Sequence, residues 1–478
     1  MRFFSTSICF LLVTGILPPL PYVGAIRGAD TISYEEVQAA SSLWTRQKGQ
    51  DWPRMLGVNY DSRSTETGII KRWPASGLGV KWTADTGVGY GNGVASQGRW
   101  FQFDRFGNKE RLTCYHAETG SFLWKWESAV EYRDAYGYNN GPRCSPVVDG
   151  DRVYVYGVAG KLACLSIADG SERWSQNTND TYNVLPNFFG VGASPLVYQD
   201  KLLVMVGGSP VTQRNQDMSI AKPSGSAMVA FDKNSGKELY RVGNYLASYS
   251  APVIQEIHGR NVCLAFVREG LLAFDPADGS KEAFFPWRAK MLESVNAASP
   301  IVWRQNILLS ETYERGSVLL GLGERGLSKL WQDGTSRKEQ VLRAHWSTPL
   351  LDGDYLYASS GRNEPDTDLR CIKLSETPQG DNLLSTAVQW TDRNRDRMTG
   401  LLVDGHALML GESGLLQLIQ LEPSRRTVVS EMSLATTSDS RDGKPLVSTP
   451  CWAPPVLSHG LLYVRGADKV VCLELIPE

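Results

Sequence analysis

The sequence predicts an all-β protein, an eight-bladed β-propeller of four-stranded antiparallel blades. Three observations predict this fold. A unit of about 50 residues recurs eight times between Gly93 and the last residue, a period typical of propellers and solenoids. Each unit holds three short apolar runs, then a turn and an aromatic residue, which makes four strands per repeat. The last unit lacks its fourth strand, and a spare strand precedes the first unit.

Each unit opens with a first strand, often marked by a small residue followed by proline. Ser145-Pro146 and Ser194-Pro195 are clear examples, and glycine or leucine takes the proline position in two units. The resulting phase of the repeat is 93, 146, 195, 252, 300, 349, 401 and 454. The first strand of every unit is therefore expected directly after one of these positions.

The second and third strands are the β-branched, aromatic or leucine-rich runs that end at glycine or polar residues. In the clearest unit they are Val153–Tyr156 and Leu162–Leu165. A turn with Gly170 follows, because glycine meets the positive φ that such a turn requires. Trp174 then starts an outer strand, where an aromatic side chain buries a large area between neighbouring sheets.

The two ends of the chain predict how the ring closes. The last unit stops after three strands at Glu478, and residues 79–84 look like the missing fourth strand. An N-terminal strand that completes the last blade would join the ends and leave no open edge. A solenoid is the competing architecture, but it needs atypical capping repeats, and the sequence contains none.

The N-terminal residues resemble a secretory signal. Met1-Arg2 precedes an apolar run from Ile8 to Leu20, with Val23-Gly24-Ala25 as a cleavage site. An uncleaved anchor is the alternative, although the run is short and proline-rich for a membrane span. We expect residues 1–25 to be a signal peptide, 26–50 a lead-in segment in which residues 34–47 could form a helix, and 51–478 the propeller. The expected location is the periplasm or cell envelope.

Charge and cysteine content narrow the class of protein. Lys and Arg number 49 against 51 Asp and Glu, a net charge of −2, which argues against a nucleic acid partner. Removing Cys9 with the signal leaves seven cysteines. Four of these recur at one position of the third strand and are expected to be small buried hydrophobes rather than disulfide partners. We expect a monomer with no transmembrane segment.

The repeat resembles a known family. Its pattern, together with Asp51-Trp-Pro-Arg54, residues 64–68, residues 186–195 and Pro286-Trp-Arg288, is similar to motifs of the bacterial PQQ-binding-like β-propeller repeat proteins. These are related to the propeller lipoprotein of the outer-membrane β-barrel assembly machine. The resemblance covers Asp51 to Glu478 and implies a propeller scaffold in the envelope, with a role in outer-membrane protein assembly.

Signals for catalysis are absent from the sequence. Quinoprotein dehydrogenases that use pyrroloquinoline quinone (PQQ) resemble this chain in fold, but their class carries adjacent cysteines, and this sequence has no such pair. No haem motif or zinc cysteine quartet is present. Gly321–Gly326 matches a dinucleotide-binding pattern but precedes a strand rather than a helix, so a turn is expected. No cofactor is predicted, and a quinone- or metal-dependent oxidoreductase remains the alternative.

The loops that enter the first strands should crowd one mouth of the central channel and carry any site. They are rich in aromatics, amides and cations, which suits a protein partner or a polar, carbohydrate-like ligand. The competing interpretation is that these side chains pack the top of the channel and bind only water. The candidate binding residues, which come from six blades, are Arg143, Asn187, Phe188, Asn296, His345 and Trp452.

Overall fold

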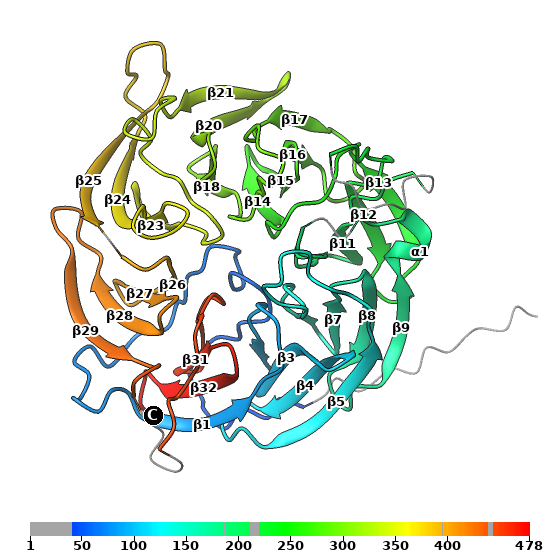
Figure 1. The fold of residues 1–478 in the computed structure, drawn as a ribbon, viewed down its shortest axis with the longest axis vertical. Helices are drawn as coiled ribbons and strands as arrows, with labels where there is room; N and C mark the ends of the chain where they lie inside the picture. The colour runs from blue at the N-terminus through cyan, green and yellow to red at the C-terminus, as the bar shows by residue number, and fades with distance from the viewer. Residues whose placement is uncertain (1–40, 186–187, 211–218, 394, 438–442) are drawn as a thin grey trace, which may run out of the picture. The chain divides into compact units, whose positions relative to one another are not determined.

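The computed structural model describes residues 41–185, 188–210, 219–393, 395–437 and 443–478. They form eight four-stranded antiparallel sheets, which stand around a central axis as the blades of a propeller (Figure 1). The predicted eight-bladed propeller is confirmed. Residues 1–40, which include the expected signal peptide, lie outside the described residues.

Blades 1 to 4 follow one another along the chain, and each runs outward from its first strand. Blade 1 comprises β2 (Val94–Ser96), β3 (Arg99–Phe106), β4 (Lys109–His116) and β5 (Phe122–Ala129). Blade 2 comprises β6 (Val147–Asp149), β7 (Arg152–Tyr156), β8 (Lys161–Ser166) and β9 (Glu172–Asn177). Blade 3 comprises β10 (Leu196–Tyr198), β11 (Lys201–Met205), β12 (Met228–Asp232) and β13 (Glu238–Val242). Blade 4 comprises β14 (Val253–Ile257), β15 (Arg260–Phe266), β16 (Gly270–Phe274) and β17 (Ala283–Pro286).

Blades 5 to 8 repeat this order, and the last blade takes its outer strand from the N-terminal side of the chain. Blade 5 comprises β18 (Ile301–Trp303), β19 (Asn306–Glu311), β20 (Gly316–Gly323) and β21 (Gly326–Gln332). Blade 6 comprises β22 (Leu350–Asp352), β23 (Tyr355–Ser360), β24 (Asp368–Ser375) and β25 (Ser385–Arg393). Blade 7 comprises β26 (Met398–Val403), β27 (His406–Gly411), β28 (Leu415–Gln420) and β29 (Thr427–Ser433). Blade 8 comprises β30 (Val456–Ser458), β31 (Leu461–Arg465), β32 (Lys469–Glu474) and β1 (Val80–Asp85).

The phase of the repeat locates six of the eight first strands directly, whereas β26 begins three residues before position 401 and β30 begins two residues after position 454. β6 and β10 begin one residue after Pro146 and Pro195, as the repeat predicts. The glycine-rich match at residues 321–326 spans the end of β20, the turn and the start of β21, so its interpretation as a turn is confirmed. One element is new, a short helix α1 (Thr178–Tyr182) whose N-cap Asn177 accepts a hydrogen bond from the Asn179 backbone.

The ring closes through the N-terminal strand. β1 pairs antiparallel with β32, with Trp82 opposite Cys472 and Asp85 opposite Lys469. The side chain of Trp82 is buried, and its Nε1 donates to the Ala117 carbonyl of blade 1 at 2.7 Å. β1 therefore completes blade 8 and also packs it against blade 1, so no strand edge is left open at this junction.

The core consists of layers between neighbouring blades. Tyr154 and Tyr156 of blade 2, for example, belong to one buried cluster with Leu202, Val204 and Phe231 of blade 3. The seven described cysteines are free and buried. Four of them lie on third strands at Cys114, Cys164, Cys371 and Cys472, as expected for small hydrophobes.

A glycine of one blade packs closely against a tryptophan ring of the preceding blade. Gly170, in the turn before β9, has a φ of +74° and lies against the Trp124 ring of blade 1. A Cβ atom at this glycine would come within 2.4 Å of Trp124 Cε3. Gly236 makes the same contact with Trp174 one blade further on. The glycine of the repeat is therefore required twice, for its backbone conformation and for close approach to the ring.

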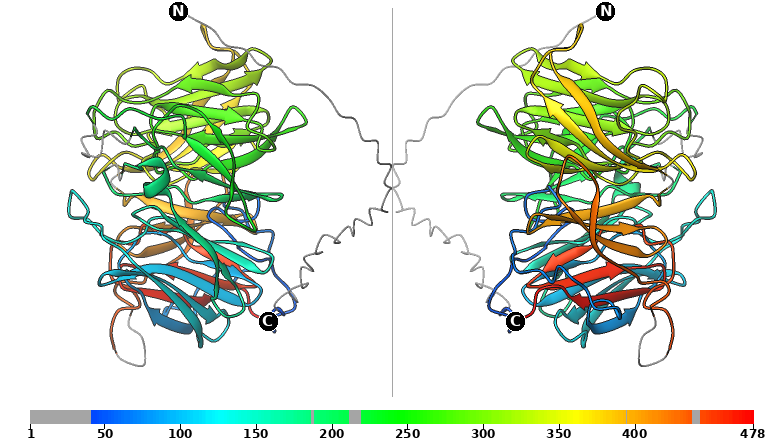
Figure 2. Two further views of the ribbon diagram at one scale, coloured as in Figure 1. Left: turned by 90° about the vertical axis from the view of Figure 1, so that its right-hand side faces the viewer. Right: turned by 90° about the vertical axis from the view of Figure 1, so that its left-hand side faces the viewer.

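Residues 41–78, here called the strap, first cross turns that join first and second strands and then pass to the outer strand of blade 7, where the Trp73 backbone donates to Ser430 Oγ at 3.0 Å. The strap forms bridges from Trp52 to Ala95 and from Arg63 to Leu402. In Figure 2 it runs in blue along one face of the propeller, and the loop after β5, in cyan, projects from the opposite face. Residues 41–47 form no helix, so the helix expected over residues 34–47 is wrong for its described part.

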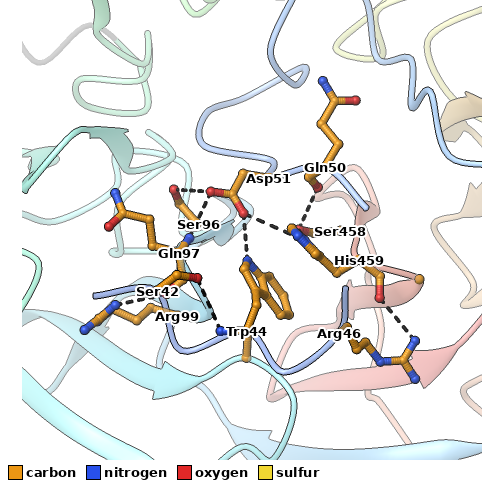
Figure 3. Close-up of polar contacts among 12 residues, drawn as sticks. Ser42, Trp44, Arg46, Gln50, Asp51, Ser96, Gln97, Arg99, Ser458 and His459 are labelled. Carbon is orange, nitrogen blue, oxygen red and sulfur yellow. Dashed lines mark hydrogen bonds and ion pairs between the residues drawn. The ribbon is translucent and has the colours of Figure 1, made fainter. Parts of the chain in front are cut away.

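Polar contacts hold the start of the strap to blades 1 and 8 (Figure 3). The Asp51 carboxylate accepts hydrogen bonds from Trp44 Nε1 at 2.8 Å, Ser96 Oγ at 2.9 Å and the Gln97 backbone at 2.9 Å. The Trp44 ring stacks on His459 with centroids 4.1 Å apart. The strap therefore bridges the two blades that meet where the ring closes.

Candidate functional site: the channel mouth

One cavity of about 390 Å³ lies on the propeller axis. The loops that enter the first strands supply it with one residue or more from each blade, including Tyr90, Arg143, Phe189, Tyr249, Ala297, His345, Arg397 and Trp452. Met55, Leu56 and Ser62 of the strap also line it. Because the strap lies at the opposite end of the channel from these loops, the cavity extends from the mouth to the strap.

Aromatic rings form a large part of the pocket wall. The Tyr90 and Trp452 rings lie 4.6 Å apart, and the Phe189 and Tyr249 rings lie 5.5 Å apart. Tyr138 connects these pairs, since its ring is 6.0 Å from Phe189 and 6.5 Å from Trp452. Tyr138 is also 62% exposed. Rings in contact with one another offer flat apolar faces with fixed orientations to a ligand.

Two guanidinium groups in the wall are held by carboxylates. Arg143 forms an ion pair with the buried Asp134 at 2.5 Å, and its guanidinium lies 5.6 Å from the centres of the Tyr90 and Phe189 rings. Arg397 forms two hydrogen bonds with Glu412, at 3.0 and 2.6 Å. These partners fix the direction of both arginines and balance their charge.

Glu412 also fixes the indole of Trp452, whose Nε1 donates to Glu412 Oε2 at 2.8 Å. The Arg397 guanidinium lies 5.4 Å from the centre of the Trp452 ring. Burial acts to raise the pKa of Glu412, but the hydrogen bonds from Arg397 and Trp452 together with the charge of Arg397 outweigh it and lower that pKa. This group therefore stays ionised and holds the cation against the ring.

His345 is uncharged at physiological pH. Removal from water lowers the pKa of its imidazole to about 3, and the positive charges of Arg397 and Arg362 add to this effect. Its ring nitrogens lie 3.3 Å from Arg397 NH1 and 3.3 Å from the Tyr313 hydroxyl. Removal from water also raises the pKa of Tyr313 to about 12, so this phenol keeps its proton.

The structure separates the six predicted site residues. Arg143, His345 and Trp452 line the pocket. Phe188 is buried, and the Arg268 guanidinium lies 5.1 Å from the centre of its ring. Phe189 lines the pocket in its place. Asn296 is buried and does not line the pocket, because its amide donates to the carbonyl of Val267 at 2.8 Å. Asn187 lies outside the described residues.

Sequence reasoning missed Tyr313 and Arg362, which line the pocket from loops between second and third strands. These loops reach the same face as the loops that enter the first strands, because strand direction alternates within a blade. The predicted four-stranded blade therefore already implied that loops between second and third strands lie at the mouth. Met55 and Leu56 were also missed, since nothing in their sequence marks the end of the channel that the strap covers.

The donor set of the described residues does not fit a metal ion. No three or more His, Cys, Asp or Glu side chains in this part of the chain are grouped so that they could hold one. The carboxylates next to the pocket, Asp134 and Glu412, are already paired with Arg143 and Arg397. Ca²⁺ prefers several oxygen ligands that converge. We therefore derive no metal-dependent step from this site.

The fold is similar to solved propellers of low sequence identity. BamB from Moraxella catarrhalis is 13% identical, with 84% of this chain and 98% of that chain covered and a TM-score of 0.53. Quinohemoprotein alcohol dehydrogenase from Comamonas testosteroni is 11% identical, with 90% and 82% covered and a TM-score of 0.57. At such identities the similarity shows the fold alone. A search of the curated proteins finds no match to this sequence.

The family comparison is more specific. The family model described as outer membrane protein assembly factor BamB matches residues 71–218 and 224–430. These ranges cover most of the propeller, from just before β1 to β29. Among the helices that the structure describes, none is long and apolar enough to cross a membrane. The chain belongs to the family of the outer membrane protein assembly factor BamB.

Proposed function

We propose that this protein is an exported, non-enzymatic propeller scaffold that binds a protein partner or a polar ligand at its channel mouth. The observation that carries the proposal is the pocket on the propeller axis, to which the entering loops of all eight blades contribute. Only a closed ring brings these residues together. A concave site with aromatic walls and a few fixed polar groups is the usual form of a binding site.

Membership of the BamB family supports a role in envelope or outer-membrane protein assembly. The apolar N-terminal run supports export to the periplasm or envelope. The exposed Tyr136 and Tyr138 at the mouth support a protein partner, because aromatic residues are enriched at protein interfaces. Monomeric behaviour of the free protein is part of this proposal.

A pull-down from the native envelope tests the proposal. Arg143→Ala and Trp452→Ala should each weaken capture of any partner that the wild-type protein binds. Leu239→Ala is the matched control, because Leu239 is exposed on the outer strand β13. Loss of capture in the control, with capture intact in the mouth variants, would show that the outer edge is the binding surface.

Added quinone and Ca²⁺ distinguish the binding function from the oxidoreductase alternative. We expect neither the absorbance spectrum nor the melting temperature of the purified protein to change. A quinone absorbance that remains with the protein after gel filtration, together with a raised melting temperature, would favour the oxidoreductase.

A further inference from the structure

We infer that one wall of the pocket, formed by Tyr313, Trp346 and Arg362, is a subsite for the carboxylate of a ring-bearing ligand. This inference deepens the proposed function, since it uses the same pocket. It rests on the direction of a hydrogen-bond chain and on two further donors that lack acceptors. These groups come from blades 5 and 6, on loops next to the channel.

The contact with Arg397 determines which nitrogen of the His345 ring carries the proton. Arg397 NH1 lies 3.3 Å from His345 Nδ1, and a guanidinium can only donate. His345 Nδ1 must therefore accept. In a neutral imidazole the proton then resides on Nε2, which lies 3.3 Å from the Tyr313 hydroxyl oxygen. His345 thus donates to Tyr313.

The hydroxyl proton of Tyr313 points away from His345. The Tyr313 hydroxyl oxygen accepts from His345, so its own O–H does not point to that ring. Tyr313 lines the pocket, and the chain from Arg397 through His345 leaves this O–H as a donor that needs an acceptor. Such a directed chain strengthens the final donor, because each hydrogen bond polarises the next one.

Two further donors, from Arg362 and Trp346, lie on the same wall of the pocket. The Arg362 guanidinium lies 4.8 Å from the centre of the Tyr313 ring, and it forms no ion pair with a carboxylate of the described residues. Arg143 and Arg397, by contrast, each have one. Trp346 lines the pocket next to His345, and its buried Nε1 has no acceptor in the described part of the chain.

Donors without protein acceptors are complementary to a ligand group that only accepts hydrogen bonds. A carboxylate is such a group, and the free positive charge of Arg362 favours an anion over a neutral carbonyl. The Tyr90, Phe189 and Trp452 rings line the same pocket, with Trp452 6.3 Å from the Trp346 ring, and they fit a flat body attached to that carboxylate. The expected ligand is therefore a ring-bearing carboxylic acid, either free or at the end of a polypeptide.

Matched acids and amides test this inference on the full mature chain. The probes are 3-phenylpropionate and 3-phenylpropionamide, and a glycyl-glycyl-phenylalanine tripeptide with a free or an amidated terminus. Binding is measured by ligand-observed NMR and by quenching of tryptophan fluorescence. We expect each acid to bind about tenfold more tightly than its amide, the effect of about one charged hydrogen bond. Tighter binding of the tripeptide acid identifies a polypeptide terminus as the source, and equal binding identifies a free acid.

Variants assign the preference to the subsite. Tyr313→Phe removes only the hydroxyl and should lower the acid preference about tenfold, as should Arg362→Met. Arg241→Met is the control, because Arg241 is an exposed arginine of β13 paired with Glu238. If Arg362→Met fails to fold, the acid preference of Tyr313→Phe alone tests the subsite. The inference is wrong if neither acid binds better than its amide, or if Tyr313→Phe leaves the preference unchanged.

The pH profile and the pull-down separate this inference from the proposed function. Because His345 stays neutral, acid affinity should be constant between pH 5.5 and 8, and a rise below pH 6.5 would overturn the hydrogen-bond chain. A partner that is lost with Trp452→Ala but kept with both subsite variants leaves the mouth as that partner's binding site and refutes a polypeptide terminus as the source of the carboxylate. Acid binding without any captured partner supports the subsite and refutes the partner-binding function.

Discussion

Loss of the Trp124 indole should destabilise the propeller by about 3–5 kcal/mol, the usual cost of truncating a buried aromatic side chain. Trp124 is 7% exposed and lies between blades 1 and 2, against Gly170. Its Nε1 donates to the Ile167 carbonyl at 3.0 Å, so Trp124→Ala also leaves that carbonyl without its partner. The lost area and the lost hydrogen bond act in the same direction.

Urea denaturation measures this effect, followed by far-UV circular dichroism and by tryptophan fluorescence. The two transitions must coincide before a free energy of unfolding is assigned. Phe122→Ala is the control, since Phe122 lies on the same strand but is 59% exposed. The control should change the free energy of unfolding by no more than about 0.5 kcal/mol.

A double-mutant cycle tests the contact itself. Gly170→Ala should be strongly destabilising alone, because its Cβ would collide with Trp124 and its φ is +74°. When Trp124→Ala is also present the collision disappears, and only the backbone cost of about 1 kcal/mol remains. The two effects should therefore be less than additive by at least about 1 kcal/mol. Additive effects would refute the proposed contact between Gly170 and Trp124.

Three further predictions follow from the fold. Deletion through Trp82 should open the edge of β32 and cause aggregation, whereas a chain that begins at Ser41 should remain soluble in gel filtration. Asp51→Ala should release the strap and speed tryptic cleavage there, and Asp61→Ala, which loses only a local contact, should not. Burial raises the pKa of Glu110 from 4.5 to about 7. The folded state favours the neutral form of Glu110. Its contribution to the free energy of unfolding is therefore fully present below pH 4.5 and is lost as the pH rises through about 7. In urea denaturation, Glu110→Gln should reduce the loss of unfolding free energy between pH 4.5 and pH 7 by up to about 3 kcal/mol. The same pH dependence in the wild type and the variant would contradict this prediction.

The blades could be predicted in detail because their signals are local and periodic. In six of the eight units a proline stands one or two residues before the first strand, and the turn glycine of the clearest units precedes an aromatic that packs on the next blade. Ring closure was also predictable, since Trp82 stood in a spare strand before the first unit and the last unit lacked one. Because the unit repeats, the fold can be predicted even though neighbouring strands of blade 8 are far apart in sequence.

The site was predictable only in part, because spacing does not determine where a loop side chain points. Arg143, His345 and Trp452 line the pocket, but Asn296 turns its amide toward backbone carbonyls and stabilises the junction of two blades. Such a choice depends on three-dimensional contacts that no repeat encodes. Tyr313 lay in a class of loop that the interpretation left out, although blade geometry brings that class to the same mouth.

Site-specific photocrosslinking in cells of the native host tests the central claim, that the channel mouth is the binding surface. A photoreactive phenylalanine analogue would replace one exposed residue at a time: Tyr138 at the mouth, Leu123 on the outer strand β5, or Val58 on the strap. The account predicts a partner adduct from Tyr138 and none from the other two positions. Adducts from Leu123 or Val58, with none from Tyr138, would contradict it.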